Sequence, residues 1–127
     1  MKITIFGSAH ILSLALLASA GAVRAEGDAA RGEKKFIDCA ACHAIEAGKN
    51  GVGPSLAGIF GRKAADNPEF RYSPAMKKSG IVWSAQTLDY YIADPQKAVP
   101  ANRMPYAGIP DAAARADLIA YLQKVLK

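Results

Sequence analysis

The residues most able to do chemistry lie together in the segment Cys39-Ala40-Ala41-Cys42-His43. Positions three and four apart share one face of a helical turn, so both thiols and the imidazole can reach the same planar group. The C-x-x-C-H spacing is that of covalent haem attachment, in which the two sulfurs add to the porphyrin vinyl groups and the histidine ligates the iron. The segment therefore predicts a haem c bound through Cys39 and Cys42, with His43 as one axial ligand.

Three other uses of these side chains remain open at this point. A structural disulfide between Cys39 and Cys42 suits an oxidising compartment, and a thioredoxin-like redox pair also uses C-x-x-C. Neither accounts for His43, and no strand-rich pattern surrounds the motif. Zinc needs about four ligands, whereas the chain has two cysteines and two histidines, and His10 lies in a segment that we expect to be removed. Haem is the interpretation that uses all three side chains.

Residues 1–25 have the features of a secretory signal peptide. Lys2 gives a positive start, residues 11–20 are almost wholly apolar, and Val23-Arg24-Ala25 places small residues where a signal peptidase reads. An uncleaved membrane anchor is the alternative, although the apolar run is short for one. We expect cleavage after Ala25, an exported periplasmic protein, and a single domain over residues 26–127. Its net charge falls by two from +5, which does not indicate a nucleic-acid partner.

A second axial ligand must come from what remains of the chain. Without the leader, His43 is the only histidine, so ligation by two imidazoles is excluded by count. Methionine is the other ligand of this kind in electron carriers, and the candidates are Met76 and Met104. We favour Met104, because two prolines and a glycine stiffen its segment, residues 99–108. An ordinary core methionine that fills a gap is the alternative at this position.

The pattern of caps and breakers predicts helices joined by long loops. Asp28, Ser73, Ser84 and Asp111 are candidate N-caps, and Pro74 suits the first position of a short helix that Gly80 ends. We expect helices over about 29–37, 74–79, 85–94 and 112–126, with a glycine-rich wrapping loop over 47–62. No stretch alternates like a strand. The fold class is therefore all-α, closed by contact between the first and last helices.

Taken in order, these motifs make the chain similar to the class I cytochromes c, of the mitochondrial-like kind found in bacterial periplasms. The similarity covers nearly all of residues 27–126 and includes the family's loop, Gly53-Pro54-Ser55-Leu56-Ala57-Gly58-Ile59-Phe60-Gly61-Arg62-Lys63. It implies the cytochrome c fold, with four to five short helices and wrapping loops around one covalently bound haem. It also implies that the N- and C-terminal helices pack together through Gly32, Phe36, Leu118 and Tyr121.

The resemblance assigns roles to the matching residues. The carbonyl of Pro54 would accept the hydrogen bond of His43, and a histidine oriented in this way is a better ligand. Tyr91 would lie beside the sulfur of Met104, which becomes the distal ligand. The inner propionate of the haem, which needs donors inside a fold, would be held by Arg62, Tyr72 and Trp83.

The chain departs from the family pattern at several positions. Met76 stands where the family commonly has an asparagine in a buried hydrogen-bond network, and Tyr106 where a phenylalanine is usual. Asp38 replaces the lysine often found before the first cysteine. The family's ring of basic residues around the haem edge is reduced in this chain to the candidates Lys97, Arg103 and Lys49. We therefore expect partner docking to be less sensitive to salt than in a strongly basic relative.

The resemblance implies a soluble one-electron carrier, a monomer and not an enzyme. Its donor would be a membrane quinol-oxidising cytochrome complex, and its acceptor a terminal oxidase or a photosynthetic reaction centre. A periplasmic dehydrogenase is an alternative partner that no residue decides. A haem peroxidase and a gas-binding haem module are the alternative functions, and both would require an open distal position.

Overall fold

A helical N-cap begins each of the elements that the sequence predicts. The computed structural model describes residues 26–126, so the predicted signal peptide and His10 lie outside the described residues. The side chains of Asp28, Ser73, Ser84 and Asp111 each accept a hydrogen bond from a backbone N–H of the first turn. The helices are α1 (Ala29–Ala40), α2 (Pro74–Lys78), α3 (Ala85–Ala93), α4 (Pro95–Ala98) and α5 (Ala112–Val125). The all-α prediction is confirmed.

α4 is the one helix that the sequence did not predict. Pro95 ends α3, as expected, but it also takes the first position of a new helical turn. Asp94 lies between the two helices in an extended conformation, and its side chain accepts a hydrogen bond from the backbone N–H of Lys97 at 3.1 Å. The same proline therefore stops one helix and starts the next.

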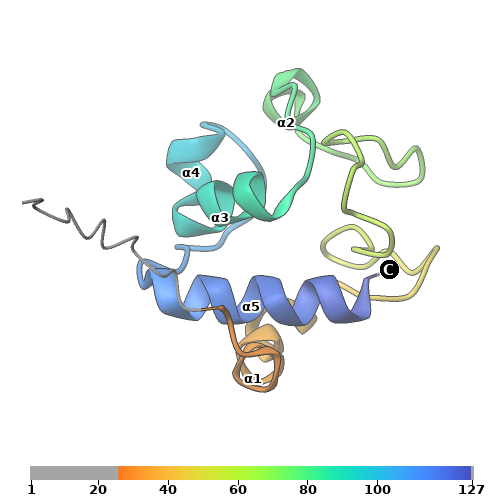
Figure 1. Ribbon diagram of the computed structural model, residues 1–127. Helices are drawn as coiled ribbons and strands as arrows, with labels where there is room; N and C mark the ends of the chain where they lie inside the picture. The colour runs from red at the N-terminus through yellow and green to blue at the C-terminus, as the bar shows by residue number, and fades with distance from the viewer. Residues whose placement is uncertain (1–25, 127) are drawn as a thin grey trace, which may run out of the picture.

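The first and last helices pack against each other, as predicted. In Figure 1, α1 is seen nearly end-on beneath α5, so the two helices cross steeply. Gly32 lies at the crossing, where an added Cβ would lie 2.8 Å from Cβ of Tyr121 and would also meet the backbone of Asp117. The rings of Phe36 and Tyr121 pack at 5.4 Å, and Leu118 is almost wholly buried. The close crossing therefore depends on the missing side chain of Gly32.

A buried carboxylate joins the start of α1 to α5. Asp117 accepts hydrogen bonds from Nε and Nη2 of Arg31, at 2.7 and 2.9 Å, and from the backbone N–H of Asp28 at 2.6 Å. The Arg31 side chain, followed by the backbone donor, holds the pKa of Asp117 below its ordinary value of 3.8 against the effect of desolvation. The carboxylate form therefore stabilises the helix crossing.

Asp117→Asn is expected to lower the melting temperature at neutral pH and to have a smaller effect near pH 3. A carboxyl group whose pKa is depressed in the folded state stabilises the fold fully above its unfolded pKa. This contribution starts to decline near the ordinary value of 3.8 and is lost as the pH falls through the lowered pKa of the folded state. Thermal unfolding of both proteins at pH 7 and pH 3 measures the difference. An equal gap in melting temperature at the two pH values would show that the charge of Asp117 has no role.

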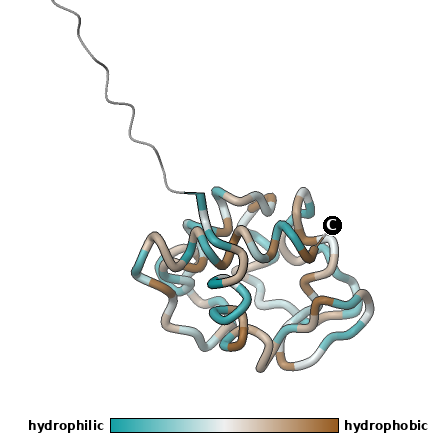
Figure 2. Tube along the Cα trace, turned by 60° about the horizontal axis from the view of Figure 1, so that its bottom comes forward, coloured by the Kyte–Doolittle hydropathy of each residue, from teal (hydrophilic) through white to brown (hydrophobic). Residues whose placement is uncertain are grey.

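Irregular chain connects α1 to α2 over residues 41–73. Apart from an isolated antiparallel bridge between Lys63 and Val82, residues 26–126 contain no β-structure. Figure 2 shows hydrophobic positions on loops as well as on helices, which fits loops that turn some of their residues inward. No helix among the described residues is long and apolar enough to cross a membrane.

Candidate functional site

A cavity of about 410 Å³ lies where the long loops meet α1, α3 and α5. Its lining is largely apolar and includes the buried side chains of Phe36, Leu88 and Leu118. Every residue that the sequence and the resemblance selected for the site lines this one cavity. These residues are Cys39, Cys42, His43, Pro54, Arg62, Tyr72, Trp83, Tyr91 and Met104.

His43 follows the C-terminal end of α1, and its ring is fixed by the loop opposite. Its backbone N–H donates to the carbonyl oxygen of Cys39 at 2.9 Å. Its Nδ1 lies 2.7 Å from the carbonyl oxygen of Pro54. Because a carbonyl can only accept, Nδ1 carries the proton, and Nε2 is left as the nitrogen able to bind a metal. The predicted contact between His43 and Pro54 is present.

Gly53 lets the loop lie directly against the imidazole. An added Cβ at Gly53 would lie 2.7 Å from Nδ1 and 2.9 Å from Nε2 of His43. The backbone N–H of Gly53 also donates to the carbonyl oxygen of Cys42 at 2.9 Å, which joins the loop to the cysteine motif. Gly53 begins the loop that resembles the family's, and its contact with His43 gives the reason for a glycine here.

The two cysteines are both partly buried at the cavity wall. Burial, with a smaller contribution from Asp38, raises the pKa of the Cys39 thiol to about 11. An apolar environment of this kind suits an uncharged thioether. Within residues 26–126 no group of three or more His, Cys, Asp or Glu side chains could hold a metal ion. The described residues therefore do not supply the four ligands that a zinc site needs.

Met104 is held by α3, α4 and its own loop. The hydroxyl of Tyr91 lies 3.9 Å from the Met104 sulfur, toward which it donates. Burial raises the pKa of Tyr91 to about 12, so the hydroxyl keeps its proton. Asn102 accepts from the backbone N–H of Met104 at 2.7 Å and donates to the carbonyl oxygens of Pro95 and Val99 at 2.8 and 2.9 Å. These bonds orient the methionine loop.

Sequence reasoning missed Asn102. An asparagine two residues before a candidate ligand, in a segment with prolines, is a signal for a side chain that bonds local backbone groups. Its link to Pro95 could not be predicted without knowledge of α4, where that carbonyl lies.

Polar side chains gather at the end of the cavity formed by residues 62–83. The backbone N–H of Trp83 donates to the carbonyl oxygen of Arg62 at 2.9 Å, which places the two residues side by side. Arg62 Nη1 donates to the carbonyl oxygen of Ala57 at 3.0 Å, which leaves the other guanidinium nitrogens for an anion. Burial raises the pKa of Tyr72, and the charge of Arg62 opposes the rise. Arg62 and Tyr72 therefore lie close enough to interact.

Met76, the other candidate methionine, also lines the cavity and is buried. Its neighbour is Ser79, whose hydroxyl donates to the Met76 carbonyl oxygen at 2.8 Å and lies 4.0 Å from its sulfur. Lining the cavity thus does not separate the two methionines. The difference is that Met104 lies on an irregular loop held by the hydrogen bonds of Asn102, whereas Met76 lies within a helix of five residues.

The donor set of the cavity fits a haem c. The lining includes two thiols and an imidazole nitrogen from one motif, a thioether from a separate loop, and many apolar side chains. It also includes cations and hydroxyl donors, which the carboxylates of a buried haem would need. No buried side-chain nitrogen or oxygen among the described residues lacks a hydrogen bond.

Comparison with known families agrees with this chemistry. The family model described as "Cytochrome c" matches residues 29–126. The chain belongs to the cytochrome c family. It is a class I c-type cytochrome, an electron-transfer protein and not an enzyme, and the cofactor of its family is haem c.

Several relatives align over most of this cytochrome. Cytochrome c2 iso-2 of Magnetospirillum fulvum is 51% identical over 90 residues, which are 71% of this chain and 94% of that protein. Cytochrome c2 of Agrobacterium tumefaciens is 50% identical over 101 residues, with 76% and 91% covered. The solved structure of cytochrome cH from Methylobacterium extorquens has 47% identity and a TM-score of 0.73, and the match covers 77% of this chain and 99% of that one.

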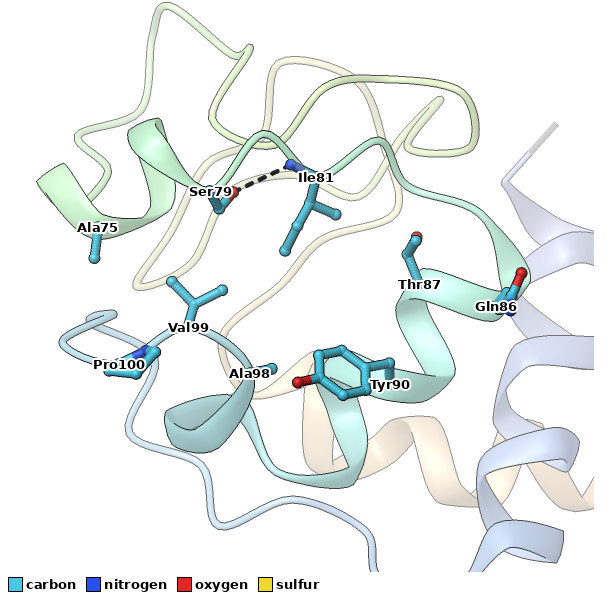
Figure 3. A pocket seen from close by; sticks show the side chains of 9 residues that line it. All are labelled: Ala75, Ser79, Ile81, Gln86, Thr87, Tyr90, Ala98, Val99 and Pro100. Atoms are coloured by element: carbon cyan, nitrogen blue, oxygen red, sulfur yellow. Dashed lines mark hydrogen bonds between the residues drawn. The ribbon is translucent and has the colours of Figure 1, made fainter.

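A second hollow of this cytochrome lies between α2, α3 and α4 (Figure 3). It is an open depression of about 680 Å³, and the side chains of Ile81, Val99 and Tyr90 point toward it. It contains no cysteine, histidine or methionine. None of the predicted site residues lies there.

Proposed function

We propose that this cytochrome is a one-electron carrier whose haem c is bound covalently by Cys39 and Cys42 and ligated by His43 and Met104. The supporting observation is that His43 and Met104 line one cavity and that the side chain of each forms a hydrogen bond with another residue of the lining. Pro54 fixes the imidazole and Tyr91 the thioether. Such partners fix the orientation of ligating groups and tune a metal site.

The bound haem supplies a one-electron Fe(III)/Fe(II) couple, which accepts one electron from a donor and passes it to an acceptor. His43 and Met104 would both bind the iron, so its ligands would change little on electron transfer and no position would be open to a substrate. Met104 favours the reduced state because a thioether is a soft ligand. The apolar lining, with Leu88 and Leu118, acts in the same direction, because a low dielectric penalises net charge.

Arg62, Tyr72 and Trp83 bind the inner propionate in this proposal. All three line the part of the cavity formed by residues 62–83, and an arginine paired with a carboxylate makes strong charge-assisted hydrogen bonds. Trp83 is further held by its ring contact with Tyr91 at 5.2 Å. The residues that orient the methionine and the residues that hold the propionate are therefore in contact.

We place the working protein in the periplasm as a monomer made of residues 26–127, after removal of the leader at residues 1–25. Support comes from the leader-like composition of that segment and from the extent of the family match, residues 29–126. Cytochromes c2 are among the relatives. The donor is a membrane quinol-oxidising cytochrome complex, and the acceptor is a terminal oxidase or a photosynthetic reaction centre.

Carbon monoxide tests the carrier against a haem peroxidase or a gas-binding module. Both alternatives need an open iron position, whereas Met104 closes it in our proposal. We expect the visible spectrum of the reduced protein to stay unchanged under carbon monoxide at neutral pH. Ready formation of a carbonyl complex would refute a stable Met104 bond and favour a ligand-binding function.

A further inference from the structure

Basic side chains outnumber acidic ones in the lining of the haem cavity. Arg62, Lys63, Arg71 and Arg103 line it, and Asp38 is its single acidic residue. Asp38 is neutralised by Lys35, whose Nζ lies 3.2 Å from its carboxylate. Within residues 26–126, none of Arg62, Lys63 and Arg71 forms an ion pair with a carboxylate. The cavity thus holds positive charge that the protein itself does not neutralise.

Three of these cations lie on the two chain segments that carry Arg62 and Tyr72. Lys63 directly follows Arg62 and forms the antiparallel bridge with Val82, next to Trp83. Arg71 directly precedes Tyr72 in a segment fixed by the edge-to-face contact of Phe70 with Tyr72 at 4.9 Å. Lys63 and Arg71 are therefore sequence neighbours of residues that the resemblance assigns to the inner propionate. The resemblance itself assigns no role to Lys63 or Arg71.

We propose that Lys63 and Arg71 form, with Arg62, a cationic rim that binds both carboxylates of the haem. The proposal rests on the proposed function, which places this cofactor in the cavity. Arg62 is half-buried, whereas Lys63 and Arg71 line the cavity with exposed side chains, so these two cations would meet the carboxylates at the solvent-exposed edge of the cavity. Asp66 also acts on Tyr72, with the opposite sign, but it does not line the cavity.

The rim has a consequence for the electron that the protein carries. The reduced haem site carries one positive charge fewer than the oxidised site, so nearby cations stabilise it and raise the reduction potential. This effect is strongest close to the haem, because exposed charges beyond about 8 Å are largely screened at physiological ionic strength. Lys63 and Arg71 should therefore act more strongly than other exposed cations.

Charge removal in the assembled holoprotein tests the rim. The variants are Lys63→Gln, Arg71→Gln and the double variant, and Arg71→Lys keeps the charge. Lys77→Gln and Lys78→Gln are matched controls, because both lysines are exposed on α2 and line neither hollow. We expect the midpoint potential to fall in the rim variants, most in the double variant, and to change less in the controls. We also expect the propionate carboxylate bands of the Gln variants to shift in redox-difference infrared spectra. In Arg71→Lys, which keeps the charge, the midpoint potential and these bands should stay close to those of the unchanged protein.

Two results would overturn the proposal that Lys63 and Arg71 bind the haem carboxylates. One is a potential shift no larger than that of the α2 controls, and the other is propionate bands that do not move in the double variant. Failure of the proposed function would look different, because the wild-type protein itself would then lack a reversible one-electron couple.

Discussion

Met104→Ala is expected to abolish the far-red ferric band of methionine-to-iron ligation and to let the reduced protein bind carbon monoxide at neutral pH. The substitution removes the sulfur that Tyr91 orients, and alanine offers no donor in its place. The reduction potential should fall as well, because a soft ligand that favours the reduced state is gone. Visible spectra of the oxidised protein, and of the reduced protein with and without carbon monoxide, measure these effects.

Met76→Leu is the matched control for this experiment. Leucine keeps most of the volume of methionine without its sulfur, and Met76 is buried in the same cavity. We expect the far-red band to remain in this variant. If the band persisted in Met104→Ala and disappeared in Met76→Leu, Met76 would be the ligand.

Gly53→Ala is expected to destabilise the protein by about 3 kcal/mol, the upper part of the range for an overpacked site. Its new methyl group would lie 2.7 Å from Nδ1 of His43. The ring or the loop must then move, which strains the hydrogen bond from Nδ1 to the Pro54 carbonyl oxygen, now 2.7 Å long. The intensity of the low-spin haem spectrum should also fall, because the displaced ring of His43 is the one that would bind the iron.

Gly51→Ala gives a control in the same loop. The added Cβ would find its nearest neighbour, the Cys42 carbonyl oxygen, at 3.4 Å, which is an ordinary contact. We expect stability and spectrum close to those of the unchanged protein. Denaturant unfolding of both variants provides the comparison, and equal stabilities would mean that Gly53 does not position the histidine.

Local signals explain how much of the fold was predictable. A capping side chain bonds backbone groups two or three residues away, so Asp28, Ser73, Ser84 and Asp111 can be recognised without tertiary information. The short turn of α4 was missed because Pro95 was interpreted only as a helix breaker. Asp94 and Pro95 repeat the cap and proline of Ser73 and Pro74, so this start carried a local signal that was overlooked.

Contacts between distant segments explain what remained unpredictable in the helix crossing and in the site. The pairing of Arg31 with Asp117 joins residues 86 positions apart, and nothing near either residue indicates its partner. Lys63 and Arg71 look like ordinary surface cations in the sequence, and only the course of the loop brings them to the cavity. The residues alone favoured Met104 for its stiffened segment, and the structure does not exclude Met76 by position, since both methionines line the same cavity.

The central claim is that Cys39, Cys42, His43 and Met104 together close the coordination of one covalently bound haem. Visible spectra of the exported protein, oxidised and reduced, combined with its intact mass, test this claim most directly. We predict the mass of residues 26–127 plus one haem, a low-spin spectrum in both oxidation states and the far-red methionine band in the oxidised state. A haem that acidic solvent extracts, or a high-spin spectrum without the far-red band, would contradict the claim.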